Sequence, residues 1–558
     1  MLTMIAELPL AGRFRDTEYQ AKSLSRTFEP APFVFERFFR RCAAIREDKR
    51  VRRVLVLAKS SFQTTTAAAL EEIRTELIAL REAGKELFYY ASDYRDRDLY
   101  LASACSQRLM HPLGFLRCAG LAHPHFFFRR LADRYDVSVQ VVRRGKYKSA
   151  ADRFRLDAID PATLEQYQRY LELSAAHLHE TILEAYEKDF GELYELLSGE
   201  VLTAATAAAR GWVDRVASLH EIRDEWRREK LKTRSVRVPR RVGRGRRIAV
   251  LTFEGSIAEG SNDFNPLLGQ VIGAQTFVPR IEHLRRNKKV KAVVLRINSG
   301  GGSAVGSEEI RGALARLGSE KPLVISMSEL AGSGGYWISL TGSTVVASST
   351  SLTGSIGAIT IAANVGDALR KQGITHSVVK THDHADVEAS LRALEGDELA
   401  SLDLQVGSIY DRFVDLVATT RGLERHEAED RAQGRIWAGA DAHAMRLVDR
   451  IGGLREAIDA ARSQAGLHRA RVEFYPRVKH SFVERIIFGA ARRTASGTLR
   501  APSIPHDRAL AISAIRALAS LAGRPMLLDP FVLRSAPSPI GSLHTGAFNA
   551  FDADLEVE

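Results

Sequence analysis

The sequence is poor in cysteine, with Cys42, Cys105 and Cys118 as the only thiols among 558 residues. An odd count without Cys-x-x-Cys spacing excludes a fully paired disulfide framework and offers no zinc-binding pattern. Long apolar runs are missing as well, because no stretch approaches the roughly 18–20 continuous apolar residues that a membrane span needs. These absences favour buried free thiols in a reducing compartment and a chain without its own membrane-spanning helix.

Two further absences concern targeting and nucleic acid. The apolar stretch before Arg13 has no basic leader in front of it, so Met4–Leu10 is predicted to be a first strand rather than a signal peptide. The net charge is +12, and much of the excess lies between Arg223 and Arg247. No nucleic-acid-binding motif accompanies this charge, so we expect a solvated basic linker and no nucleic-acid partner. Peripheral contact with an anionic membrane surface stays a secondary interpretation.

What the chain does contain is an internal repeat. Glu71-Glu-Ile-Arg74 recurs as Glu308-Glu-Ile-Arg311, an offset of 308 − 71 = 237 residues. Each copy of this signature follows a short β-branched run, which is typical of a buried strand. The same offset pairs Leu99–Ala102 with Tyr336–Ser339 and Val141–Val142 with Val378–Val379. Strands alternating with helices predict two related α/β domains, each built around parallel strands.

A chain of 558 residues is too long for one ordinary core, which agrees with this division. The predicted parts are an N-terminal domain over residues 1–222, a basic linker over 223–246, a C-terminal domain over 247–475 and an extension over 476–558. In the extension we expect two helices, 482–493 and 508–522. Their apolar faces favour docking on the protein's own surface over membrane anchoring.

A glycine turn, Ser299-Gly-Gly-Gly-Ser303, follows the predicted strand Ala292–Ile297 and precedes a helix. Glycines there let backbone N–H groups approach an anionic oxygen, and the helix N-terminus adds partial positive charge. The turn could hold a phosphate, stabilise an oxyanion, or be a plain tight turn. The phosphate interpretation is weakened because neither a Walker A loop nor a dinucleotide fingerprint is present.

Ser333 follows the predicted strand Pro322–Met327 and lies among Gly332, Gly334 and Gly335. A serine on a strand-to-helix turn exposes its hydroxyl and presents the next N–H to a developing oxyanion. The alternative is that these glycines only pack a helix against the sheet. The first interpretation makes Ser333 a candidate nucleophile.

A nucleophilic serine needs a base, and His376, His382 and His384 lie in a charged stretch of the same copy. His382 and His384 also suggest a metal site, but no third ligand stands at a recognised spacing, so a solvated loop is favoured. At the 237-residue offset, Ser333 corresponds to Asp96, Lys148 to Ala385, and Gly301 and Gly302 to Thr64 and Thr65. Each copy thus lacks what the other has. A Ser/Lys pair can form only across the domain or subunit boundary.

Three motifs resemble the signal peptide peptidase A family, also called protease IV, in its long tandem form. They are Ser333-Gly-Gly-Tyr-Trp337, Thr353-Gly-Ser-Ile-Gly357 and Tyr147-Lys-Ser-Ala150. The resemblance implies two crotonase/ClpP-like domains of ββα units, a homotetramer, no cofactor, and hydrolysis of unstructured apolar peptides such as remnant signal peptides. It also implies that Ser333 is the nucleophile, Lys148 the general base and Ser355 the residue that orients the lysine.

Lys148 must be neutral to accept the Ser333 proton, whereas a free lysine has a pKa of about 10.4. Lowering that pKa by about three units corresponds to about 4 kcal/mol, which burial in an apolar interface can supply. Lys146 is the competing lysine, and only the family motif selects Lys148. Backbone N–H groups of Gly302, Gly334 and, as a further candidate, Gly301 would form the oxyanion hole.

The chain departs from the family in two places. Gly300 stands where the family usually has a proline, and the membrane-anchoring segment with which long members typically begin is not evident here. Membrane association is therefore expected from the resemblance alone, with a cytoplasmic location as the alternative. Two other functions stay open at this point: an acyl-CoA enzyme of the crotonase fold, and a non-catalytic assembly scaffold.

Overall fold

The first copy of the repeat forms a parallel sheet. The computed structural model describes residues 4–18, 31–234, 236–265, 269–476 and 526–528. Side chains alternate along its strands, so that Leu55 faces one side of the sheet while Val54 and Val56 face the other. The strand order is β10 (Arg215–Val216), β6 (Gln107–Met110), β5 (Glu86–Ala91), β4 (Val51–Ala58), β1 (Met4–Leu10) and β11 (Lys232–Arg234).

The second copy builds a related, mainly parallel sheet. Its central strand β17 is flanked by β13 and β19, and all three are almost fully buried, as expected of β-branched runs covered on both faces. The strand order is β12 (Val242–Gly243), β25 (Ala470–Tyr475), β13 (Arg246–Glu254), β17 (Val290–Ser299), β19 (Leu323–Gly332), β20 (Thr344–Ala347) and β24 (Arg450–Ile451). β21 (Leu352–Gly354) extends it beside β19, and β23 (Ile436–Ala438) pairs with β21.

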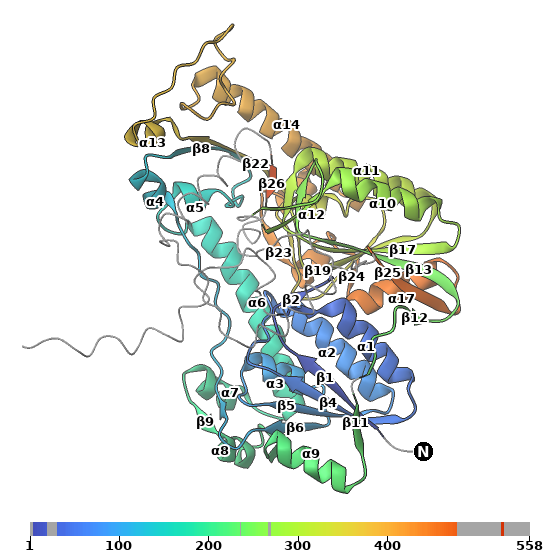
Figure 1. The fold of residues 1–558 in the computed structure, drawn as a ribbon. Coiled ribbons are helices and arrows are strands. Elements are labelled where there is room, and N and C mark those ends of the chain that lie inside the picture. Colours follow the sequence, from blue (N-terminus) through green and yellow to red (C-terminus); the bar gives the residue numbers. More distant parts are fainter. Residues whose placement is uncertain (1–3, 19–30, 235, 266–268, 477–525, 529–558) are drawn as a thin grey trace, which may run out of the picture.

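The two sheets are stacked with helices between and outside them (Figure 1). Helix α2 (Ala67–Glu82) lies in the middle layer and packs against both β5 and β19. α1 (Phe35–Glu47) and α17 (Leu454–Gln464) share that layer, and one apolar core joins residues of both copies there. α9 (Leu219–Arg228) covers the outer face of the first sheet, whereas α10 (Ala274–Arg286) and α11 (Ala304–Glu320) cover the outer face of the second.

A third sheet mixes strands of both copies and of the C-terminal extension. Its order is β15 (Asp263–Asn265), β16 (Gly269–Gly273), β14 (Ser256–Ala258), β18 (Gly301–Ser303), β26 (Met526–Leu528), β22 (Ala358–Asn364) and β8 (Ser138–Arg144). β8 belongs to the first copy and runs antiparallel to β22 over its whole length. This pairing brings the segment after β8 to the edge of the second copy.

The repeat predicted from the sequence is present in the structure. The offset of 237 residues holds for α2 and α11, whose first residues are 67 and 304, and for β5 and β19, whose first residues are 86 and 323. Later the offset is 396 − 161 = 235 residues between α6 (Pro161–Tyr186) and α14 (Gly396–Arg421). The chain therefore consists of two tandem α/β units. The same spacing recurs between α7 (Phe190–Leu197) and α15 (Arg425–Arg431), and between α8 (Ala204–Ala209) and α16 (Gly439–Ala444).

One predicted match between the copies is wrong. Val141 and Val142 lie in β8, whereas Val378 and Val379 lie outside any strand and Val379 is fully exposed. The two copies differ here, because the first supplies a strand to the shared sheet and the second a surface loop. Ala385, in that loop, is consequently not the structural counterpart of Lys148.

The basic segment 223–246 is not a plain linker. Its first residues complete α9, and Lys232–Arg234 then forms β11, which pairs with β1 in the first sheet. Val242–Gly243 forms β12, which pairs with β25. Helix periodicity and strand pairing thus absorb much of a tract that charge alone marked as solvated. The residue limits of the predicted domains stay a prediction.

The remaining elements are short. The two helices predicted over 482–493 and 508–522 lie outside the described residues. Among the residues that are described, no helix has the length and apolar character to cross a membrane. The short elements are β2 (Phe14–Arg15), β3 (Phe33–Val34), β7 (Phe115–Leu116), β9 (Leu202–Thr203), α3 (Asp96–Ala102), α4 (Arg129–Arg134), α5 (Asp152–Arg155), α12 (Gly334–Trp337) and α13 (Gly366–Lys371).

Candidate active site

Ser333 lies where β19 ends and α12 begins, and its side chain is fully buried. Its φ of 54° and ψ of −117° are rarely adopted by a residue with a side chain. The strain is held by hydrogen bonds on both sides, because Ser333 N donates to Gly354 O at 2.8 Å and Trp337 N donates to Ser333 O at 2.8 Å. Such strained strand-to-helix turns occur at sites where a hydroxyl must project from the end of a sheet.

Lys148, from the first copy, reaches this hydroxyl within the same chain. Its Nζ lies 2.7 Å from Ser333 Oγ, 2.8 Å from Ser355 O and 3.0 Å from Ser355 Oγ. All three side chains are fully buried. Lys146, by contrast, is exposed and contacts the hydroxyl of Tyr147. The structure thus brings Ser333, Lys148 and Ser355 together and leaves the competing lysine at the surface.

Residues that the sequence analysis did not select hold Lys148 in place. Gln166, on α6 of the first copy, donates from Nε2 to Tyr147 O at 3.0 Å and accepts from Ile436 N at 2.9 Å. Gly434, in the second copy, lies against the backbone of Lys148, where an added Cβ would come within 2.6 Å of Lys148 N. Neither residue belongs to a recognisable motif. Only their place in the repeat, just before β23, could have drawn attention to them.

The glycine turn lies beside the N-terminus of α12. A Cβ added to Gly334 would lie 3.0 Å from Gly301 Cα, so the absence of a side chain permits this close approach. Gly301 N donates to Ser299 Oγ at 3.2 Å, which engages that N–H within the turn. Gly302 follows with a φ of 151°. Of the three predicted donors, Gly302 and Gly334 are therefore better candidates than Gly301.

Charged side chains also cross between the copies behind the site. Arg296 is buried and donates from Nε to Asp16 Oδ1 at 2.8 Å and from Nη2 to Glu72. Burial raises the pKa of Glu72 to about 7, although Arg296 opposes this shift. Glu329, on β19, accepts from Thr65 N at 2.7 Å and from Thr66 N at 3.0 Å. These contacts fix how the lysine-bearing and serine-bearing copies sit against each other.

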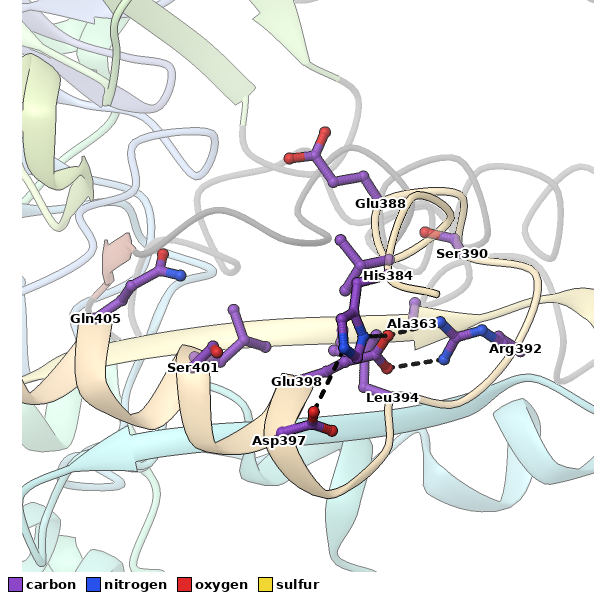
Figure 2. A pocket seen from close by; sticks show the side chains of 13 residues that line it. Ala363, His384, Glu388, Ser390, Arg392, Leu394, Asp397, Glu398, Ser401 and Gln405 are labelled. Atoms are coloured by element: carbon purple, nitrogen blue, oxygen red, sulfur yellow. Dashed lines mark hydrogen bonds and ion pairs between the residues drawn. The ribbon is translucent and has the colours of Figure 1, made fainter. Parts of the chain in front are cut away.

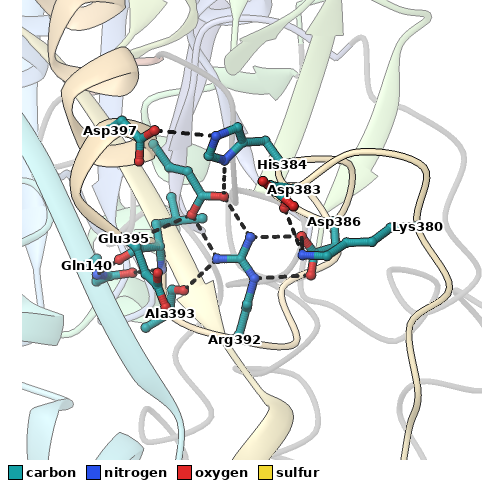
Figure 3. Close-up of polar contacts among 11 residues, drawn as sticks. Gln140, Lys380, Asp383, His384, Asp386, Arg392, Ala393, Glu395 and Asp397 are labelled. Atoms are coloured by element: carbon teal, nitrogen blue, oxygen red, sulfur yellow. Dashed lines mark hydrogen bonds and ion pairs between the residues drawn. The ribbon is translucent and has the colours of Figure 1, made fainter.

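The histidine stretch forms a surface loop, as the sequence analysis favoured. His384 lies between Glu398 and Asp397, and Arg392 bridges Asp386 and Glu398 (Figure 3). The hydrogen bond to Glu398 and the charge of Asp397 raise the pKa of His384. Within the described ranges, no cluster of three or more His, Cys, Asp or Glu side chains could hold a metal ion.

A cavity of about 310 Å³ lies between this loop, β22 and the start of α14. Figure 2 shows Ala363 of β22 on one side and Ser401 and Gln405 of α14 on the other. His384 and Arg392 lie along its rim, and their ion pairs fix the loop that closes it. The carboxylate contacts of His384 therefore have a structural explanation.

Comparison with known proteins gives the same result over both copies. The model of peptidase family S49 matches residues 79–232 and 315–468. Protease 4 of Salmonella typhi is 31% identical over 456 residues, which cover 77% of this chain and 72% of that protein. Protease 4 of Haemophilus influenzae is 29% identical over 443 residues, with 73% and 69% covered.

A plant relative matches too. The chloroplastic serine protease SPPA of Arabidopsis thaliana is 27% identical over 414 residues, with 71% of this chain and 61% of that protein covered. A solved ClpP1 chain from Listeria monocytogenes aligns with 38% of this chain and 94% of its own length, at 12% identity and a TM-score of 0.25.

The tandem α/β units and the serine at the end of β19 place this chain in the class of serine peptidases. The chain belongs to peptidase family S49, whose model matches it once in each copy. The family assignment sets aside the acyl-CoA enzyme and the non-catalytic scaffold.

Proposed function

We propose that the chain hydrolyses peptide bonds by an acyl-enzyme route, with Ser333 as nucleophile and Lys148 as general base. The observation that carries this proposal is the 2.7 Å separation between Lys148 Nζ and Ser333 Oγ at a fully buried site. That distance permits direct proton transfer, and burial disfavours the charged ammonium that could not act as a base. The Ser355 side chain and carbonyl, both in contact with Nζ, would orient the amine.

In the first half of the reaction, neutral Lys148 accepts the Ser333 hydroxyl proton while Oγ bonds to the carbonyl carbon of the substrate. The carbonyl oxygen becomes an oxyanion, which the N–H groups of Gly302 and Gly334 would stabilise. Lys148 then donates its proton to the leaving amine as the C–N bond breaks. In the second half, Lys148 accepts a proton from water, whose oxygen attacks the acyl-enzyme and releases Ser333.

The shared third sheet supports an extended peptide as substrate. Met526–Leu528 of the chain's own extension runs antiparallel to β18, with Leu527 opposite Gly302, and Met526 lies opposite Ile359 of β22. A peptide strand therefore fits between the glycine turn and β22. Addition of an extended segment to sheet edges is a common form of peptide recognition, and it requires an unstructured substrate.

Three finer parts of the proposal derive from the family resemblance. They are the preference for apolar peptides such as remnant signal peptides, the assembly into a tetramer, and the contact with a membrane surface. The described contacts within one chain do not bear on the tetramer, which stays a prediction. The Ser333–Lys148 contact lies within one chain, so the proposed mechanism needs no neighbouring subunit to complete the pair.

A serine-directed fluorophosphonate probe tests the proposed nucleophile. We expect the full chain to cleave an unstructured apolar peptide and the probe to attach to Ser333, located by mass spectrometry of the labelled peptide. Activated serines react with such probes because a nearby base removes the hydroxyl proton. Ser333→Ala is expected to abolish labelling and cleavage. The matched control is Ser339→Ala, because Ser339 is equally buried but donates to Tyr336 O. Labelling at another residue would disprove the assignment.

The position of β26 gives a second prediction. Leu527→Pro should raise the rate of Ser333 labelling and lower the KM for peptides, each by about three- to tenfold, because proline lacks the N–H that a strand paired on both sides needs. The released segment would no longer compete with a peptide for the same edges. Leu543→Pro, outside the described residues, is the control and should change neither quantity. An unchanged or slower rate in the Leu527 variant would contradict this peptide-binding position.

A further inference from the structure

The first copy contains a counterpart of the glycine turn. α2 begins at Ala67 and α11 at Ala304, and their N-cap residues are Thr66 and Ser303, again 237 positions apart. Thr65 thus occupies the place of Gly302, and Thr66 that of Ser303. Both turns follow a central strand of their sheet and lead into a long helix, so each directs N–H groups and the positive end of a helix dipole to one spot.

In the first copy, that spot is filled by an oxygen from the second copy. Thr65 N and Thr66 N both donate to Glu329 Oε1, at 2.7 and 3.0 Å. Glu329 is 5% exposed. Burial raises its pKa to about 7, while the two N–H donors, the charge of Arg13 and the charge of Asp16 modify that shift. The turn without glycines thus binds a carboxylate oxygen as a fixed part of the structure.

The location of Glu329 connects this contact with the active site. Glu329 lies on β19, three residues before the strand ends at Gly332, and Ser333 follows directly. α2, whose N-terminal end receives the carboxylate, belongs to the copy that supplies Lys148. β19 and α2 also pack against each other. The Glu329 contact therefore ties the serine-bearing strand to the lysine-bearing copy without an intervening loop.

We propose that Glu329 is a positioning residue for the nucleophile. Its carboxylate, held by the turn at Thr64–Thr66, sets the position of β19 along α2 and so places Ser333 Oγ within reach of Lys148 Nζ. The inference rests on the proposed roles of Ser333 and Lys148. It also gives the altered turn of the first copy a purpose, because an anion-binding turn that no longer faces a substrate serves to align the two copies.

Other carboxylates cross the same boundary but reach different elements. Glu254 accepts from Asp16 N and Thr17 N, both at 3.1 Å, at the end of β13. Glu76, on α2, pairs with Arg455 of α17 at 2.6 Å. These contacts hold the copies together at positions away from the end of β19. Among these carboxylates, only Glu329 lies on the strand that leads into Ser333.

The test compares three substitutions of Glu329 in the full chain. Glu329→Ala is expected to lower kcat for an unstructured peptide by about 10- to 100-fold with less than a threefold change in KM, since a shift of about 1 Å in a reacting group can cost this much. Glu329→Gln should retain at least about a third of kcat, because an amide oxygen can accept both N–H groups. Glu329→Asp, which withdraws the oxygen by one methylene, should fall between them and serves if the alanine variant does not fold.

Glu76→Ala is the matched control. It removes a buried carboxylate that also joins α2 to the second copy, so it should lower the melting temperature while kcat stays within about twofold of wild type. The inference is overturned if Glu329→Ala keeps wild-type kcat, if Glu329→Gln is as impaired as Glu329→Ala, or if Glu76→Ala loses kcat to the same extent. Failure of the proposed function looks different, because the wild-type chain would then neither cleave peptides nor be labelled at Ser333.

Discussion

Replacing Lys148 by methionine is expected to lower kcat for peptide hydrolysis by about four to six orders of magnitude, the range found when one member of a nucleophile–base unit is removed. Methionine fills a similar volume without an amine, so the fully buried pocket should stay packed. The melting temperature should therefore not fall. Ser333→Ala should be equally inactive, and the double variant no worse than either single variant, because the two groups act as one unit.

Lys146→Met is the control for this experiment. Lys146 stands two positions away on the same loop but is exposed, with its Nζ 3.3 Å from Tyr147 Oη. It should keep full activity. If the Lys148 variant instead retained more than about 1% of wild-type kcat, a base other than Lys148 would have to take the Ser333 proton, and the proposed mechanism would be wrong.

Local pattern explains why much of this fold could be predicted. Val54–Ala58 and Ala292–Ile297 are short β-branched runs followed by amphipathic segments, and both form central strands followed by helices. The repeat could be found because α2 and α11 preserve the Glu-Glu-Ile-Arg signature at matching positions. These features depend on neighbouring residues in the chain. A single sequence therefore contains them in readable form.

The contact between Lys148 and Ser333 needed a different source. Comparison of the copies indicated that neither was complete, and the family resemblance selected Lys148 over Lys146. Distance and partner came only with the structure, which brings residues 185 positions apart to 2.7 Å. The pairing of β8 with β22 makes this possible. Spacing between the repeats had instead suggested a match between Val141 and Val378, because the offset is not constant over the segment where the copies diverge.

Gln166, Glu329 and Gly434 show what sequence reasoning missed and why. Gln166 and Glu329 look like ordinary polar residues of a helix and a strand, yet both are buried and accept hydrogen bonds from the other copy. Their partners are backbone N–H groups, which leave no trace in residue type. Cross-domain contacts of this kind follow from how two finished units pack. Hydrophobic periodicity does not encode them.

Gly434→Ala is expected to lower kcat by about 100-fold or more, because it would displace the backbone that carries Lys148. An added Cβ would lie 2.6 Å from Lys148 N and 2.8 Å from Lys148 Cα, and main-chain atoms cannot move aside as a flexible side chain can. Gly434 itself cannot retreat easily, since its N–H donates to Ile356 O at 2.7 Å, one residue after Ser355. The substitution therefore pushes Lys148 away from the hydroxyl that it must deprotonate.

Backbone strain must be separated from this displacement, because Gly434 has a φ of +74° that disfavours alanine by about 1 kcal/mol or more. Gly373→Ala provides the matched control, since Gly373 has a φ of +78° but no atom within 4 Å of an added Cβ. Both variants should lose stability in thermal unfolding, and only Gly434→Ala should lose kcat and Ser333 labelling. Equal kcat in the two variants would mean that Lys148 tolerates the shift, and that its 2.7 Å contact with Ser333 is not what limits the reaction.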